Sequence, residues 1–157
     1  MSMRNQRLLI CLNWPKIILV GCYFLLSKKV IVVINVLLAS YKGQAFLPAQ
    51  ILSIMRQENV DVRLNISDDE SADSLYQFLN NDSICLPYLN NVTIMNGPKN
   101  GVNANFLRLI HNASVQKNSL YAFADQDDIW LSRKLDSAQR HLNALVDNDD
   151  EQVALYM

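Results

Sequence analysis

Apolar residues recur with a different spacing in successive segments of the chain, and each spacing predicts a strand or a helix. Val30–Ser40 is β-branched and almost continuously apolar, a pattern typical of a strand buried on both faces of a parallel sheet. Between Gln44 and Glu58 the apolar side chains recur at helical spacing, which predicts an amphipathic helix. Val60–Ile66 alternates apolar and polar residues, and this predicts a strand with one wetter face, nearer the sheet edge.

The alternation of predicted strands and helices continues in the second half of the chain. Ser71 or Asp73 can cap the next helix, and Asn100-Gly101 opens another, on which Phe106, Leu107, Ile110 and Ala113 share a face. The other expected elements are strands at Val92–Met95 and Leu120–Ala124, a last helix marked by Leu135, Ala138, Leu142, Leu145 and Val146, an acidic loop at Asp147–Glu151, and a short strand at Val153–Tyr156.

Strands that alternate with helices predict right-handed βαβ crossovers, and hence a mostly parallel, open α/β sheet with helices on both faces. Ligands bind such sheets outside the carboxyl ends of the strands. The conspicuous polar residues follow strands in this chain, at Ser40-Tyr41, Asp68-Asp69, Asn100-Gly101 and Asp125–Asp128. We therefore expect a polar, acidic site at one end of an otherwise apolar sheet.

The most acidic of these segments holds Asp125, Asp127 and Asp128, directly after an apolar run. Clustered carboxylates repel one another unless a cation or hydrogen-bond donors neutralise them. Mg²⁺ and Mn²⁺ suit such oxygen ligands and take their remaining ligands from water and substrate phosphates. The segment predicts a divalent metal and a phosphate-bearing substrate. The alternative is that the aspartates only end a strand and cap the next helix.

Composition narrows the classes of function. The chain has 157 residues, 50% of them hydrophobic, which is enough for one domain with a real core. A net charge of −1 with scattered basic residues gives no case for nucleic acid as a partner. Cys11, Cys22 and Cys85 show no metal-ligand spacing and leave an odd count, so a reducing, cytoplasmic setting fits. His111, His141 and Trp130 are expected to be exposed or packing residues, with no part in metal binding or sugar contact.

Residues Met1–Lys29 differ in composition from the rest and read as a hydrophobic leader. Their clean apolar stretch is Ile17–Leu26, about ten residues, too few to cross a hydrocarbon core of roughly 30 Å. No small-residue cleavage site follows. We expect surface attachment or a poorly structured leader, even one arising from an upstream start codon, with membrane insertion as the alternative. The expected location is the cytoplasm, with peripheral association at the inner face of the cytoplasmic membrane as a further option.

Four motifs occur in order along the chain: LLASYKG, ISDDESAD, NGPKNGVNANF and FADQDDIWLSRK. Together they resemble the nucleotide-sugar-binding half of family 2 glycosyltransferases, which have the Rossmann-like GT-A fold. The resemblance runs from about Val32 to the end of the chain. The DQDDIW form of the acidic loop looks most like bacterial rhamnosyltransferases of surface-polysaccharide assembly. The resemblance implies transfer from dTDP-rhamnose or a UDP-sugar to a glycan or lipid-linked acceptor, with Mg²⁺ or Mn²⁺ as cofactor.

The resemblance also implies a role for individual residues. The backbone of Ala39 and the ring of Tyr41 would bracket the base, and Asp68 would accept a hydrogen bond from a base N–H. Asp127 would ligate the metal that bridges the diphosphate. The implied nucleotide-sugar-binding residues are Ala39, Tyr41, Asp68, Asp125 and Asp128, and the implied metal ligands are Asp127 and Asp125.

In this family the acceptor-binding half and the catalytic base lie further along the chain. Residues 30–157 are therefore expected to be the donor-binding part, with the base beyond residue 157. A truncated or decayed transferase that binds nucleotide without turnover is the main alternative. An oxidoreductase is disfavoured because SYKGQAF has a single glycine where GxGxxG is needed. A phosphoacceptor receiver domain would need paired acids where this chain has Ala39-Ser40-Tyr41.

Overall fold

The computed structural model describes residues 33–113 and 119–145. The expected leader at 1–29, the first residues of the first strand, the acidic loop at 147–151 and the strand at 153–156 lie outside the described residues. Within the described ranges, no helix combines the length and apolar character needed to cross a bilayer.

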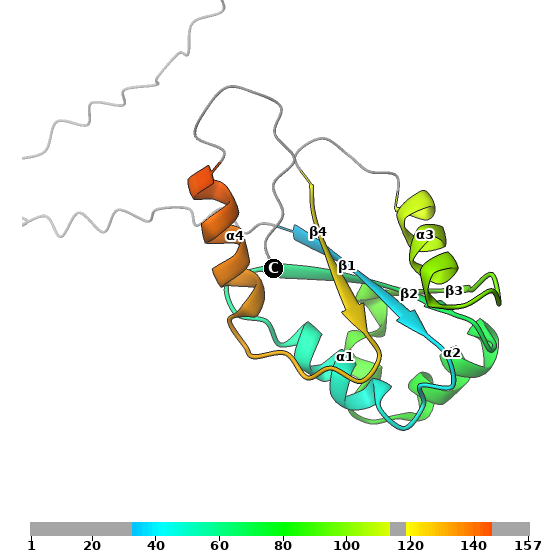
Figure 1. The fold of residues 1–157 in the computed structure, drawn as a ribbon. Coiled ribbons are helices and arrows are strands. Elements are labelled where there is room, and N and C mark those ends of the chain that lie inside the picture. Colours follow the sequence, from blue (N-terminus) through cyan, green and yellow to red (C-terminus); the bar gives the residue numbers. More distant parts are fainter. Residues whose placement is uncertain (1–32, 114–118, 146–157) are drawn as a thin grey trace, which may run out of the picture.

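Four parallel strands form one sheet in the order β3-β2-β1-β4 (Figure 1). The expected α/β class with a parallel sheet is confirmed. The chain adds β2 and β3 on one side of β1 and then returns to place β4 on the other side, so the strand order reverses between β1 and β4. The elements are β1 (Val33–Ser40), α1 (Leu47–Met55), β2 (Asp61–Asp68), α2 (Ala72–Asn81), the 3₁₀ helix η1 (Leu86–Asn91), β3 (Val92–Asn96), α3 (Val102–Asn112), β4 (Leu120–Asp125) and α4 (Lys134–Leu145).

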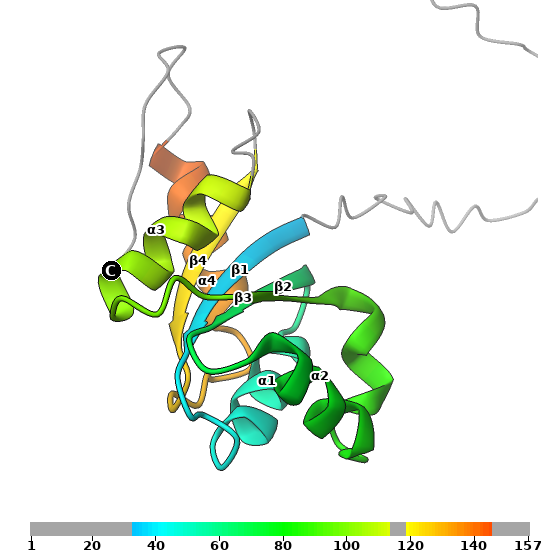
Figure 2. The same ribbon diagram turned by 90° about the vertical axis from the view of Figure 1, so that its right-hand side faces the viewer.

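Helices cover both faces of the sheet: α1 and α2 pack on one face and α3 on the other (Figure 2). β1 is buried on both faces, as its unbroken apolar run predicts. Alternate residues of this strand enter two separate clusters, because successive side chains point to opposite faces. The larger cluster contains Val36, Leu38, Leu64 and Ile66 with Leu47, Ile51 and Leu75, and the smaller contains Leu37, Ala39 and Leu109.

The expectation that the second strand lies nearer the sheet edge is wrong. β2 pairs with β1 on one side and with β3 on the other, so it is an interior strand. Its wetter face has a different cause: Asp61 and Arg63 are exposed at the amino-terminal end of the strand, whereas Ser67 on the same face is fully buried near α3. The alternation of apolar and polar residues in β2 therefore arises because helices cover only part of one face of the strand, and not because the strand lies at an edge of the sheet.

The expected face of α3 is right in part: Phe106 and Ala113 pack against the smaller cluster, but the other two residues do not. Leu107 and Ile110 are exposed, at 60% and 37%, and the buried residues of the helix are Asn105 and Leu109. Asn105 faces the sheet because its side-chain amide nitrogen donates to the carbonyl oxygens of Ser40 and Ser67. This polar anchor on α3 turns the apolar face of the helix partly away from the sheet.

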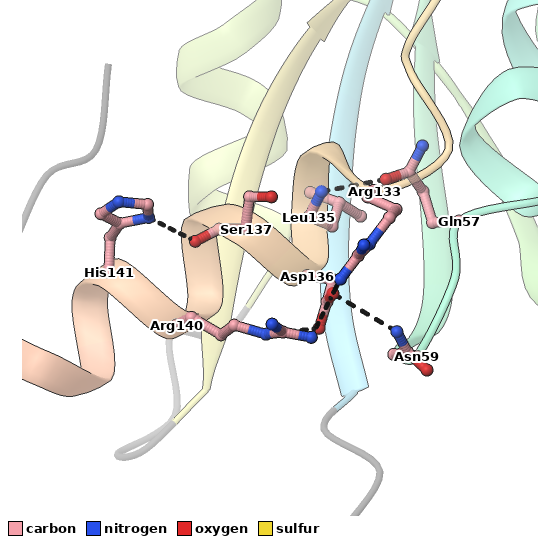
Figure 3. Close-up of polar contacts among 8 residues, drawn as sticks. All are labelled: Gln57, Asn59, Arg133, Leu135, Asp136, Ser137, Arg140 and His141. Atoms are coloured by element: carbon pink, nitrogen blue, oxygen red, sulfur yellow. Dashed lines mark hydrogen bonds and ion pairs between the residues drawn. The ribbon is translucent and has the colours of Figure 1, made fainter.

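Gln57, a buried residue just after α1, fixes the start of α4. Its Oε1 accepts a hydrogen bond of 2.9 Å from the backbone N–H of Leu135 (Figure 3). Its Nε2 donates to the carbonyl oxygen of Leu131 at 2.7 Å. The first N–H groups of a helix lack partners within the helix, so this side chain takes the place of an N-cap. Gln57 thereby sets where the acidic loop after β4 returns to the body of the protein.

A second anchor of α4 is Asp136, which is 5% exposed and meets three donors. Arg140 binds both carboxylate oxygens, at 3.2 and 2.8 Å, while Arg133 and Asn59 each donate to Oδ2 at 3.3 Å (Figure 3). Burial alone would raise the pKa of Asp136, but hydrogen bonds from Asn59, Arg133 and Arg140 outweigh it and hold the pKa below the usual value. Asn59 lies two residues before the start of β2, so this cluster lies at the amino-terminal end of the sheet.

Candidate functional site

A cavity of about 600 Å³ lies at the carboxyl ends of the strands. Strand register aligns these ends: Ser40 pairs with Asp68, and Ala39 pairs with Asp125. The volume falls in the range of about 300–1,000 Å³ that is usual for small-molecule sites. The cavity spans the point between β1 and β4 where the strand order reverses, which is where open α/β sheets bind ligands. Its lining residues are Ala39, Ser40, Tyr41, Asp69, Lys99, Gly101, Val102, Asn105, Asp125, Gln126 and Asp127.

The acidic loop contributes two of its three carboxylates to this cavity. Asp125 ends β4, and both Asp125 and Asp127 line the cavity, whereas the exposed Asp128 is not among the lining residues. Over the part of the chain that the structure describes, no three His, Cys, Asp or Glu side chains gather into a metal-binding group. The expected cluster of three carboxylates is therefore a pair at the cavity and a third side chain outside it.

The loop after β1 forms the facing wall. Ala39 is buried, and Tyr41 is 56% exposed, so its ring is accessible to a ligand. The backbone N–H of Tyr41 donates to Oε1 of Gln126 at 2.8 Å, which joins this loop to the acidic loop. Both residues expected to bracket a base, Ala39 and Tyr41, thus line the same cavity as Asp125 and Asp127.

The two adjacent aspartates after β2 lie in different places: one is buried away from the cavity and the other lines it. Asp68 is 5% exposed and absent from the cavity lining, and its Oδ2 accepts a hydrogen bond of 2.9 Å from the backbone N–H of Ser71, at the start of α2. Asp69 lines the cavity. The second aspartate of the pair, which the sequence motif did not single out, is the one at the cavity wall.

Three further lining residues were missed at the level of sequence. Asn105 lies four positions before Leu109 on the buried face of α3, and a polar residue on that stripe was the available signal. Lys99 is the single lysine of the NGPKNG turn and has a left-handed backbone, with φ of 57°, an uncommon conformation for a residue with a side chain. Gln126 stands inside the acidic motif itself.

Gly97 is the residue that lets the wall close around Asp69. A Cβ at Gly97 would overlap the Asp69 carboxylate and lie 3.0 Å from Oδ1 of Asn105. The Gly97 N–H also donates to the carbonyl oxygen of Asp68 at 2.7 Å. Glycine at this position therefore serves a close approach of side chains to the backbone.

The charged groups on the described lining are three carboxylates, Asp69, Asp125 and Asp127, and one ammonium group, Lys99. Such a wall repels a diphosphate unless a cation intervenes. Asp125 and Asp127 fit a divalent ion of the Mg²⁺ or Mn²⁺ type, which uses one or two protein carboxylates and completes its shell with phosphate and water oxygens.

Trp130 and the two histidines take the packing and surface positions expected of them. Trp130 is 5% exposed, its backbone N–H donates to Oγ of Ser53, and Nζ of Lys134 lies 4.2 Å from its ring centroid. His111 and His141 are exposed on α3 and α4, and neither lines the cavity. Nδ1 of His141 contacts the carbonyl oxygen of Ser137 on its own helix.

Comparisons with known proteins show the family of the chain and structures with a similar fold. Residues 35–152 match the model of Glycosyl transferase family 2. The dTDP-rhamnosyl transferase RfbG of Shigella flexneri is 32% identical over 101 residues, which are 64% of this chain and 35% of RfbG. The structure resembles S. aureus TarS 1-349 in complex with UDP-GlcNAc, with a TM-score of 0.56 and 19% identity over 71% of this chain and 31% of that one. The complex of TarS 1-349 with UDP gives a TM-score of 0.53, 18% identity and coverage of 71% and 32%. The chain spans about a third of the length of these relatives.

Proposed function

The chain belongs to glycosyltransferase family 2, and from this premise we propose that its cavity binds the nucleoside-diphosphate sugar that donates in sugar transfer. One observation carries the proposal: residues that follow all four strands line one cavity, and two carboxylates stand at its β4 side. A nucleoside diphosphate offers a flat base, a ribose and an anionic tail, which need a stacking wall at one end and a cation at the other. Tyr41 and the pair Asp125 and Asp127 supply these two ends.

In this proposal the base lies between the backbone of Ala39 and the ring of Tyr41. Asp125 contacts the ribose and shares the metal with Asp127, and Asp128 orients these neighbours or faces the sugar. In this proposal Asp68 accepts the base N–H through Oδ1, since its Oδ2 accepts from the backbone N–H of Ser71. Asp68 does not line the cavity, so this contact rests on the sequence resemblance and not on the cavity lining. Uracil and thymine both present that N–H, so a contact with Asp68 would not separate the two.

In this proposal Asp125 and Asp127 contribute to the chemical step by holding the metal ion. A bound Mg²⁺ or Mn²⁺ supplies Lewis-acid stabilisation of the charge that builds on the departing nucleoside diphosphate. Asp125 and Asp127 fix where that stabilisation acts, since they belong to one short loop whose two ends are tied to the sheet and to α4. The chain thus couples donor binding to departure of the nucleotide.

For the sugar we propose rhamnose, carried by dTDP. Two observations support it: the DQDDIW motif and the similarity to a dTDP-rhamnosyl transferase. A UDP-sugar is the second candidate, favoured by the likeness in fold to TarS solved with UDP-GlcNAc. The proposed acceptor is a glycan or lipid-linked glycan of bacterial surface polysaccharide.

The described lining residues leave no carboxylate for the acceptor hydroxyl. Asp125 and Asp127 hold the metal in this proposal, and Asp69 accepts a hydrogen bond from the backbone N–H of Lys99. A general base must come within about 3 Å of the proton it takes, so we assign donor binding, and no base, to these residues. Nucleotide binding without transfer is the rival function, and measuring nucleotide affinity and sugar transfer in the same preparation separates the two.

Calorimetric titration of the full chain with UDP and dTDP, in Mn²⁺ and in EDTA, tests the proposal. We expect clearly tighter binding of both nucleotides with the metal, because the cavity wall is net acidic without it. Equal affinity in EDTA would remove the metal from the proposal. No binding of either nucleotide under both conditions would remove the donor site itself.

A further inference from the structure

Gln126 makes a hydrogen bond that joins the two loops of the cavity. Its side-chain Oε1 accepts from the backbone N–H of Tyr41 at 2.8 Å, across 85 positions of sequence. Both residues line the cavity. The bond runs from the loop that follows β4 to the loop that follows β1, so it spans the point where the strand order reverses.

The loop after β1 leaves room for this contact at Gly43. A Cβ on Gly43 would stand 2.6 Å from Oε1 of Gln126 and 2.9 Å from Oγ of Ser40. A separation of 2.6 Å lies inside van der Waals contact, so any side chain at Gly43 would displace the Gln126 amide. The backbone of Gly43 has an ordinary negative φ, and the need for glycine here is therefore one of space.

We propose that Gln126 is a positioning residue that couples the metal end of the donor site to its base end. The inference rests on the proposed function, since it assumes that Asp125 and Asp127 hold the metal and that Tyr41 stacks on the base. Gln126 stands between these two aspartates in the chain. Ordering of the acidic loop by metal and diphosphate then fixes Gln126, which in turn fixes the loop that presents the Tyr41 ring.

Coupling of this kind has a thermodynamic signature. If the metal end orders the base end, binding at the base end must favour the metal end by the same factor. Removing the bond between Gln126 and Tyr41 should then abolish the extra affinity that the base gives a nucleotide. The affinity for the diphosphate alone should be unchanged. A purely structural role for Gln126 would weaken both ligands together.

Pyrophosphate separates the two ends because it carries the diphosphate without the base. The experiment measures affinity for UDP, dTDP and inorganic pyrophosphate in Mn²⁺, for the wild type, Gln126→Ala and Gln126→Glu. The quantity compared is the ratio of nucleotide affinity to pyrophosphate affinity. Glutamate keeps an oxygen that accepts from the Tyr41 N–H, and its added charge acts on the diphosphate of both ligands alike.

We expect Gln126→Ala to lower the ratio by about threefold to tenfold, the effect of one lost hydrogen bond, with pyrophosphate affinity unchanged. Gln126→Glu should keep the wild-type ratio even if both affinities fall. Gly43→Ala should reproduce the alanine result, because it displaces the same amide from the other side. Thermal unfolding of each variant checks that the fold is intact.

A double-mutant cycle with Tyr41→Ala completes the test. Without the ring there is nothing for Gln126 to position, so Gln126→Ala should have no further effect on the ratio. Equal ratios in wild type and Gln126→Ala, or equal losses for nucleotide and pyrophosphate, would overturn the coupling. If instead the wild type binds neither nucleotide in a metal-dependent way, the proposed function fails first, and the two failures are told apart.

Discussion

Asp69 accepts a hydrogen bond of 2.9 Å at Oδ1 from the backbone N–H of Lys99, and this contact holds a lysine in the left-handed region of backbone space. Asp69→Ala removes the acceptor and should destabilise the protein by about 1–3 kcal/mol, because the freed N–H belongs to a strained turn. Asp69→Asn keeps an acceptor oxygen and should therefore destabilise the protein clearly less than Asp69→Ala. Urea denaturation of both variants measures the difference. Equal losses would mean that the charge of Asp69 matters and its hydrogen bond does not.

The Asp136 cluster should make stability depend on pH in the acid range. Because the pKa of Asp136 is lowered in the folded state, its contribution is fully present above the unfolded pKa of about 4 and is lost as pH falls through the folded value. Asp136→Asn should be less stable than the wild type at pH 7, and the gap should narrow below about pH 4. Urea titrations at several pH values measure it. A gap independent of pH would contradict the assigned ion pairs.

Cys85 should make stability fall at alkaline pH. Burial, with a smaller contribution from the neighbouring Asp82 carboxylate, raises the pKa of the Cys85 thiol from 9.0 to about 12. Above pH 9 the unfolded chain loses this proton and the folded chain keeps it, so rising pH stabilises the unfolded state relative to the folded state. The stability advantage of the wild type over Cys85→Ala should shrink between about pH 9 and pH 11. A constant difference across that range would show that the thiol ionises freely in the fold.

The order and type of the four described strands and four α-helices could be predicted from sequence because the period of the hydrophobic pattern reports them directly, whereas the 3₁₀ helix η1 was not predicted. Their bounds were less accurate where a turn precedes a helix. The helix expected from Gln44 begins at Leu47, because the N–H groups of Phe46 and Leu47 both bond to the carbonyl oxygen of Gly43 and form a turn first. Periodicity does not record such local hydrogen bonds.

Which strand lies at an edge could not be read from a single strand's pattern. The alternation in β2 suggested an edge, whereas the strand is interior and one of its faces is only partly covered. Edge position depends on the order in which later strands join the sheet. That order is set by contacts between segments far apart in sequence.

The sequence predicted that the site lies at the carboxyl ends of the strands. It predicted less well which side chains line the cavity. Ala39, Tyr41, Asp125 and Asp127 line one cavity, whereas Asp69 takes the wall position beside the expected Asp68. Beyond the end of a strand the alternation of side chains no longer applies, so sequence cannot decide which of two adjacent aspartates faces a ligand. The roles of all these residues toward a donor stay predictions.

The donor sugar is open to a direct comparison. Saturation-transfer NMR of the protein with dTDP-rhamnose, UDP-glucose and UDP-galactose, under one metal concentration, should give the strongest sugar signals for dTDP-rhamnose. The motif DQDDIW and the similarity to RfbG support that expectation. A clear preference for a UDP-sugar would defeat the rhamnose assignment and leave the fold and the metal role untouched.

The most direct test of the account compares two aspartates at opposite ends of the sheet. Asp127 lines the cavity at the carboxyl ends, and Asp136 sits in the α4 cluster at the amino-terminal end. Binding of UDP or dTDP is measured by calorimetry in Mn²⁺ and in EDTA for Asp127→Asn, Asp136→Asn and the wild type. We predict that Asp127→Asn loses the metal-dependent gain in affinity while Asp136→Asn keeps it under conditions where it is folded. A full metal-dependent gain in Asp127→Asn would contradict the account.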